Sequence, residues 1–138
     1  MKISLIGWKD NSVNIFPQLV KSLSKKISGL EVSIRFVPFF EDIPAVCMEE
    51  ASSSNFLIAF ALLGEEEEVK FLKKKLVDVE LLTKTRVLKW VEEDSFNGNK
   101  NDDLIDEKEE LVEEISKTVV SILFKESDFV PQEKDDNF

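Results

Sequence analysis

Trp8, Phe39 and Phe40 are aromatic side chains that stand where buried strands are expected to end. Flat rings of this kind can stack on a planar ligand at little cost in side-chain entropy. Asp42 follows closely, where its carboxylate can accept hydrogen bonds from a polyol chain, and Gly64 closes the longest apolar run. These five residues are the candidate ligand-binding positions. Three of them also have a structural interpretation. Phe39 and Phe40 fit a subunit interface or the core, and Asp42 fits a helix N-cap.

The composition excludes much catalytic chemistry. The chain has no histidine, which removes the commonest general base, the Ser-His and Cys-His nucleophile pairs and most catalytic zinc sites. Cys47, the single cysteine, follows Ile43 by one helical turn, and we interpret it as a buried core residue rather than a reactive thiol. Glu65–Glu68 would repel a phosphate group at the start of the helix they open. No catalytic residue is therefore assigned.

Charge is unevenly distributed along the chain. The net charge is −10, and from Glu92 onward there are 16 of the 28 acidic residues but only 5 of the 18 basic ones. An acidic final third repels a phosphate backbone, and we expect no nucleic-acid partner because the sequence offers no local basic groove. Glu92, Glu93 and Asp94 could hold Mg²⁺ through oxygen ligands, although clustered acids in a loop are more often solvated. We expect no cofactor, with Mg²⁺ as the alternative.

The apolar pattern alternates between strand and helix. Four short apolar runs have the character of buried strands: residues 3–8, 31–37, 56–62 and 85–91. Apolar residues at helical spacing follow each of them: residues 15–27, 43–52, 65–79 and 104–122. This order predicts an α/β domain with a parallel sheet and right-handed crossovers. Ligands of such sheets bind beyond the carboxyl ends of the strands, where the candidate residues are expected.

The length of 138 residues fits one domain, expected over residues 1–126 and followed by an acidic, disordered tail at 127–138. Residues 92–103 are polar and are expected to form a mobile loop. No apolar run approaches the roughly 20 residues of a membrane span, so no membrane association is expected. The lone cysteine and the lack of an apolar leader favour a cytoplasmic location.

One segment resembles a known family. Residues 37–47, Val-Pro-Phe-Phe-Glu-Asp-Ile-Pro-Ala-Val-Cys, resemble the Val-Pro-Gly-x-x-Asp-Leu/Ile-Pro-Val-Ala-Cys segment of archaeal riboflavin synthases, which belong to the lumazine synthase superfamily. Residues 61–64, 81–88 together with Glu93 and Asp94, and 122–125 look like later blocks of that family in the same order. The resemblance thus covers most of the chain.

The resemblance implies a flavodoxin-like three-layer sandwich with a four-stranded parallel sheet, assembled into homo-oligomeric rings, usually pentamers, with ligand sites between subunits. It also implies a transferase that needs no cofactor and dismutates 6,7-dimethyl-8-ribityllumazine to riboflavin mainly by positioning and stacking. The sequence departs from the family at Phe39, which stands where the family has glycine, and lacks the family's histidine. A catalytically inactive paralogue, acting as an assembly or regulatory subunit, and an unrelated interaction domain are the alternatives.

Overall fold

The computed structural model describes the backbone of residues 1–96 and 101–129, and the side chains of residues 1–96 and 105–124. Within this part the strands are β1 (Lys2–Trp8), β2 (Glu31–Val37), β3 (Phe56–Leu63) and β4 (Arg86–Glu93). The helices are α1 (Phe16–Lys26), α2 (Ile43–Ala51), α3 (Glu66–Thr83) and α4 (Asn101–Phe129), with a short 3-10 turn, η1 (Phe40–Asp42), before α2. These bounds agree closely with the pattern of apolar residues along the chain.

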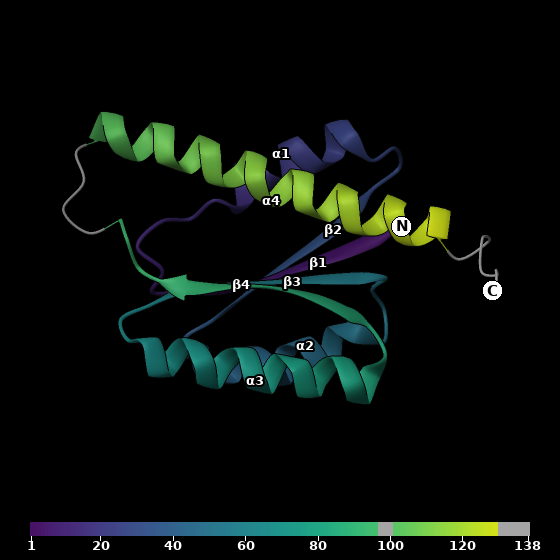
Figure 1. Ribbon diagram of the computed structural model, residues 1–138, viewed down its shortest axis with the longest axis horizontal. Helices are drawn as coiled ribbons and strands as arrows, with labels where there is room; N and C mark the ends of the chain where they lie inside the picture. Colours follow the sequence, from purple (N-terminus) through teal and green to yellow (C-terminus); the bar gives the residue numbers. More distant parts are fainter. Residues whose placement is uncertain (97–100, 130–138) are drawn as a thin grey trace.

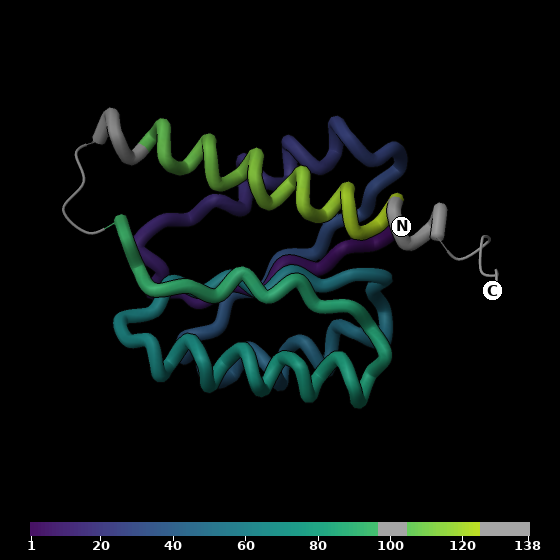
Figure 2. The backbone as a smooth tube through the Cα atoms, in the orientation of Figure 1, coloured from purple at the N-terminus to yellow at the C-terminus, as the bar shows by residue number. Residues whose placement is uncertain are grey.

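All four described strands are parallel and lie in the order β2-β1-β3-β4. Helices α1 and α4 cover one face of the sheet, and α2 and α3 cover the other (Figure 1). The arrangement is the flavodoxin-like three-layer sandwich that was expected. The carboxyl ends of the strands and the connections that leave them lie together at one end of the molecule, at the left of the view in Figure 2.

Strand β3 is the centre of the fold because all eight of its residues are apolar and buried. Its alternate side chains enter two separate cores, one beneath α1 and α4 and one beneath α2 and α3. Helices α1 and α3 meet these cores with the predicted apolar stripes, whereas α4 buries Val112, Ile115 and Val119. The buried stripe residues are Leu19 and Leu23 of α1, Ile15 and Ile27 at its ends, and Val69, Leu72, Leu76 and Val79 of α3. The prediction that Cys47 is a core residue is also confirmed.

The prediction of a loop over residues 92–103 is wrong at both ends. Glu92 and Glu93 continue β4, where they pair with Leu62 and Leu63 of β3, and α4 already begins at Asn101. Backbone pairing can extend through Glu92 and Glu93 because β4 is an edge strand and both of these side chains are exposed. Residues 97–100 lie outside the described part.

At the carboxyl terminus, α4 extends to Phe129, into the segment predicted as a tail, and residues 130–138 lie outside the described part. None of the described helices has both the length and the apolar character that crossing a membrane requires.

Candidate functional site

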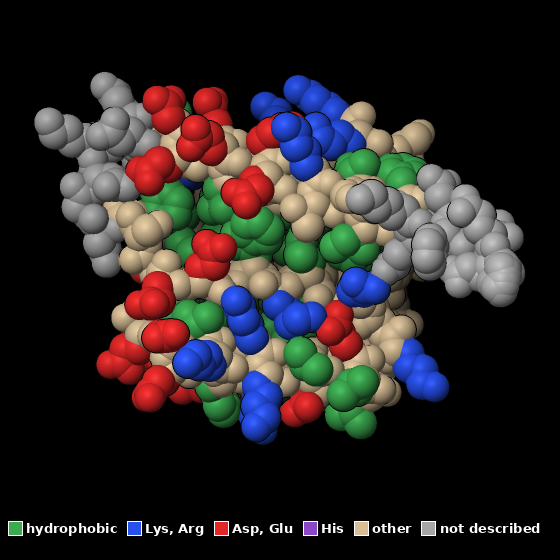
Figure 3. Space-filling model, viewed as in Figure 1, with side chains coloured by type: hydrophobic (Ala, Val, Ile, Leu, Met, Phe, Trp, Pro, Cys, Tyr) green, Lys and Arg blue, Asp and Glu red, His purple; other side chains and the backbone are tan. Residues whose placement is uncertain are grey.

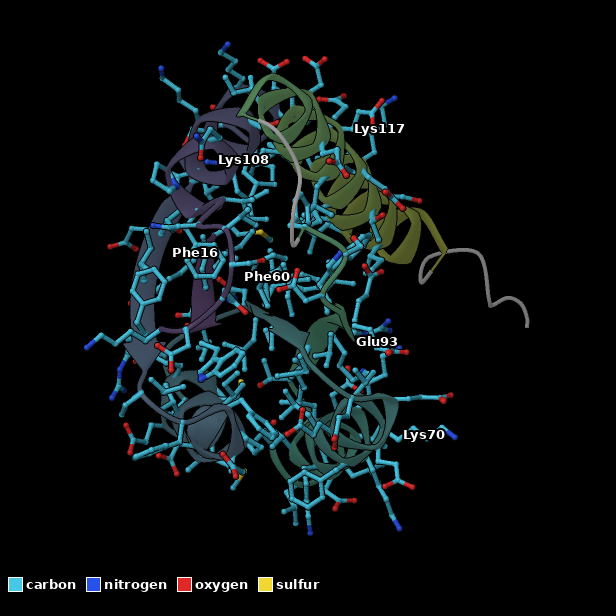
Figure 4. The ribbon with its side chains drawn as sticks, turned by 90° about the vertical axis from the view of Figure 1, so that its left-hand side faces the viewer. Phe16, Phe60, Lys70, Glu93, Lys108 and Lys117 are labelled. Atoms are coloured by element: carbon cyan, nitrogen blue, oxygen red, sulfur yellow. The ribbon has the colours of Figure 1, made fainter. Side chains whose placement is uncertain are left out.

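A small aromatic pocket lies at the carboxyl ends of β1, β2 and β3, on the face of the sheet that α1 covers. It has a volume of about 210 Å³. The residues that line it are Trp8, Lys9, Asn11, Val13, Asn14, Phe16, Phe36 and Phe60. The ring centroid of Phe16 lies 5.4 Å from that of Phe36 and 6.1 Å from that of Phe60. Phe16 and Phe60 lie side by side between α1 and the sheet when the molecule is viewed from this end (Figure 4).

Gly7 allows this aromatic cluster to pack directly on β1. A Cβ atom at this position would lie 2.8 Å from Cε2 of Phe16 and 3.3 Å from Cδ1 of Phe36. Real Cβ atoms do not approach other carbon atoms as closely as the first of these distances, because close-packed interiors have no room for such overlap. Glycine is therefore required here for the close approach of a ring to the strand.

Asn11 fixes the loop that follows β1 above the pocket. The backbone pairing of β1 with β3 ends at Gly7 and Phe60. Beyond that point the Asn11 side chain takes over: its Nδ2 donates to the Phe60 carbonyl at 3.2 Å, and its Oδ1 accepts from the Leu62 N–H at 2.8 Å. A side-chain amide carries the same donor and acceptor as a peptide group, so Asn11 replaces a missing strand residue.

The same loop is tied to the end of β4 through Asp94. The Ser12 hydroxyl donates to Asp94 Oδ1 at 2.9 Å, and the Phe96 N–H donates to the same oxygen at 2.9 Å. These bonds give the Asp94 carboxylate a structural role. Among the described residues, no group of three or more Cys, Asp or Glu side chains is placed to hold a metal ion. The Mg²⁺ alternative at Glu92, Glu93 and Asp94 thus finds no geometric support in this region.

Of the five candidate residues, only Trp8 is among the pocket-lining residues, and its ring packs with Phe40 against the core beneath α2 and α3, on the other face of the sheet from Phe16 and Phe60. The rings of Trp8 and Phe40 meet edge to face with centroids 5.8 Å apart, and Trp8 Nε1 donates to the Pro38 carbonyl at 3.3 Å. Phe39 is 65% exposed and does not line the pocket. Pro38 and Phe40, which follow β2, thus hold the Trp8 ring in place.

Asp42 and Gly64 also lie outside the pocket lining. Asp42 is exposed and occupies the N-cap position of α2, as predicted, but its side chain makes no capping hydrogen bond. Gly64 lies between β3 and α3, where the one atom within 4 Å of an added Cβ would be Glu68 Oε1, at 3.9 Å. The structure therefore separates these two residues from the aromatic cluster.

Seven of the eight lining residues are not among the five candidates, and four of these seven are central to the site. Phe60 belongs to a wholly apolar strand, which predicts a core residue, and Phe16 stands at a helix start, where nothing in the sequence indicated a pocket. Phe36 lies on edge strand β2 and is 47% exposed. The alternation of side chains along β2 could have indicated its position from the sequence. Asn11 gave no signal, because its partners are main-chain groups of another strand.

The chemistry of the pocket suits binding more than catalysis. Lys9 is the one ionisable side chain among the described lining residues. Asn14 is occupied locally, since its Oδ1 accepts from the Phe16 N–H at 3.1 Å. Cys47 is far less nucleophilic than an ordinary thiol, because burial, assisted by the nearby Glu50 carboxylate, raises its pKa to about 12. The arrangement offers flat apolar walls, an amide rim and one cation.

No protein-family model matches this chain, and its sequence matches none of the curated proteins. The resemblance to archaeal riboflavin synthases therefore rests on the residue blocks quoted above.

Proposed function

We propose that this protein binds a planar heterocycle of the lumazine or flavin type in the aromatic pocket. The observation that carries the proposal is the convergence of Phe16, Phe36 and Phe60 on one cavity at the carboxyl ends of three strands, with Trp8 at its edge. In the strand order β2-β1-β3, the chain turns in opposite directions from β1, and the crevice at such a switch point is where open parallel sheets bind ligands.

The size of the pocket indicates which part of a ligand it accepts. Its volume of about 210 Å³ is below the roughly 300–1,000 Å³ of pockets that enclose a whole drug-sized molecule. A fused ring would stack against the aromatic lining, while a ribityl chain would remain at the rim. There, Lys9 can donate to ring carbonyl or hydroxyl oxygens.

Turnover of 6,7-dimethyl-8-ribityllumazine to riboflavin is the catalytic form of this proposal. The alternative is an inactive paralogue that serves as an assembly or regulatory subunit. That alternative is favoured by the lack of an acid or base other than Lys9 among the described lining residues. Riboflavin formed from the lumazine by the pure protein would establish the catalytic form, and binding without turnover would select the alternative.

Self-association is a second part of the proposal. Ile34 and Phe36 of edge strand β2 and Phe39, which follows the strand, are 42%, 47% and 65% exposed. Exposed apolar patches of this kind are typical of interfaces. We expect a homo-oligomer in analytical ultracentrifugation, and the resemblance implies a pentamer. The variant Phe39→Glu should dissociate it, and a wild-type protein that sediments as a monomer would refute this part.

Ligand binding is tested by fluorescence titration with riboflavin and with the lumazine. The chain has two tryptophans, and Trp90→Phe leaves Trp8 as the sole reporter. This substitution should be tolerated because Trp90 Nε1 is buried without a hydrogen-bond partner in the described part. We expect ligand to quench Trp8 emission. An unchanged spectrum at millimolar ligand would remove the support for the proposal.

A matched pair of phenylalanine variants locates the binding site. Phe36→Ala removes a pocket wall, whereas Phe71→Ala removes a ring of similar exposure on α3, 45% against 47%. Loss of one stacking wall should weaken binding by about tenfold, which corresponds to about 1.4 kcal/mol. The Phe71 variant should bind like the parent protein. Equal affinities of the two variants would place the ligand elsewhere.

A further inference from the structure

A groove at the end of the sheet opposite the aromatic pocket concentrates positive charge. Residues 70–89 carry seven basic and two acidic side chains in a chain whose net charge is −10. Four of these cations, Lys73, Lys84, Arg86 and Lys89, and one acid, Glu80, line an open cavity of about 820 Å³ beside β4. Figure 3 shows basic side chains gathered over α3 and β4 on this face. The expectation that the chain lacks a local basic groove is therefore wrong, because α3 and β4 come together only in the fold.

The groove runs along the open edge of the sheet. In the described part, β4 pairs only with β3. On its other side, the Val87 N–H donates to Glu80 Oε2 at 2.8 Å, and the Val87 carbonyl accepts from Lys89 Nζ at 3.1 Å. Lys89 Nζ also lies 2.6 Å from Glu80 Oε1. The Glu80–Lys89 ion pair thus occupies the two hydrogen-bonding positions that a neighbouring strand would fill at Val87.

We infer that this groove binds a short extended peptide rich in carboxylates, which adds to the sheet as a strand beside β4. Peptide carboxylates would pair with the groove cations, and the peptide backbone would replace the Glu80 and Lys89 side chains at Val87. Alternation along the strand turns the main-chain groups of Lys89 and Val91 to the same edge, where they can continue the ladder.

The lining favours a peptide over a nucleic acid. Leu81, Leu88 and Ile122 lie beside the cations and match the apolar side chains of an alternating strand. No aromatic ring lines the described groove, so bases would find no stacking surface. Further along β4, Glu92 and Glu93 repel anions. The acidic part of the ligand is thereby confined to the amino half of the strand.

The alternative is that the Glu80–Lys89 ion pair only prevents other strands from pairing with the edge of β4. The two roles differ in their response to a peptide. We would measure fluorescence anisotropy with a fluorescein-labelled peptide of about eight residues that alternates Glu and Val. Binding is expected, and Lys84→Glu should weaken it by about tenfold. Lys70→Glu is the matched control, because Lys70 pairs with Glu66 and does not line the groove.

Strand addition is separated from simple charge attraction by methylating alternate backbone nitrogens of the peptide. This change keeps every side-chain charge but blocks pairing, so affinity should fall by about tenfold or more. Amide NMR signals of Lys89 and Val91 should shift with the unmethylated peptide. Equal binding of the methylated peptide, equally tight binding of an oligonucleotide of the same charge, or no anisotropy change would each overturn the inference.

Discussion

Replacing Gly7 with alanine would test how tightly the aromatic wall of the pocket packs on β1. The new Cβ would lie 2.8 Å from Cε2 of Phe16, whose side chain is only 2% exposed and cannot turn into solvent. Overpacking a core typically costs about 1–3 kcal/mol. Alanine returns about 0.5–1 kcal/mol of this by restricting the unfolded chain. The difference between the two terms is about 0–2.5 kcal/mol, and because the contact at 2.8 Å is a direct overlap, we expect the free energy of unfolding to fall by about 1–2 kcal/mol.

Urea unfolding followed by tryptophan fluorescence measures this change. The control is the same substitution in a Phe16→Leu background, where the shorter side chain leaves room for the new methyl group. The cost of Gly7→Ala should be smaller there by about 1 kcal/mol, which is the coupling between the two positions. The displaced ring should also narrow the pocket and weaken ligand binding. An alanine variant as stable as wild type, or an equal cost in both backgrounds, would refute this account of the wall.

Three further predictions concern the residues around the site. Asn11→Ala deprives two β3 main-chain groups of their partners and should cost about 2–4 kcal/mol in urea unfolding. Water that reaches these groups would reduce the cost, but a loss below about 1 kcal/mol would contradict the bridging role of Asn11. Cys47, with its pKa raised to about 12, should react with a thiol reagent at about pH 8 only as fast as the protein unfolds; rapid labelling of the native protein would count against its burial. For Glu50, burial alone would raise the pKa, but hydrogen bonds from Ser4 and Arg35 outweigh burial and lower it. The charged carboxylate therefore stabilises the fold above its unfolded pKa, and this contribution is lost as the pH falls through the folded pKa. Glu50→Gln should lose less stability than wild type on acidification, and parallel curves for the two proteins would exclude such a contribution.

The sequence was sufficient for the fold because its elements are strongly patterned. Strand β2 has the predicted bounds of Glu31–Val37, and the uninterrupted apolar run of β3 identified the central strand. The failure at Glu92 and Glu93 has a physical cause. Side-chain polarity suggested a loop there, but the backbone of an edge strand can pair regardless of charges that point to water.

The site was harder to predict because its residues serve packing and binding at once. Phe16 and Phe60 have the burial of ordinary core residues, and only the fold shows that a cavity opens beside them. Strand ends drew attention to Phe39, which the structure leaves outside the pocket. The bridge made by Asn11 joins residues far apart in sequence, so no local pattern could have indicated it.

The most direct test of ring binding is an NMR measurement of intermolecular nuclear Overhauser effects between the protein and riboflavin or 6,7-dimethyl-8-ribityllumazine. The account predicts cross-peaks from the ring methyl protons of the ligand to the aromatic protons of Phe16, Phe36 and Phe60, the phenylalanines that line the pocket. Cross-peaks to Phe71 in their place, or none at saturating ligand, would contradict it.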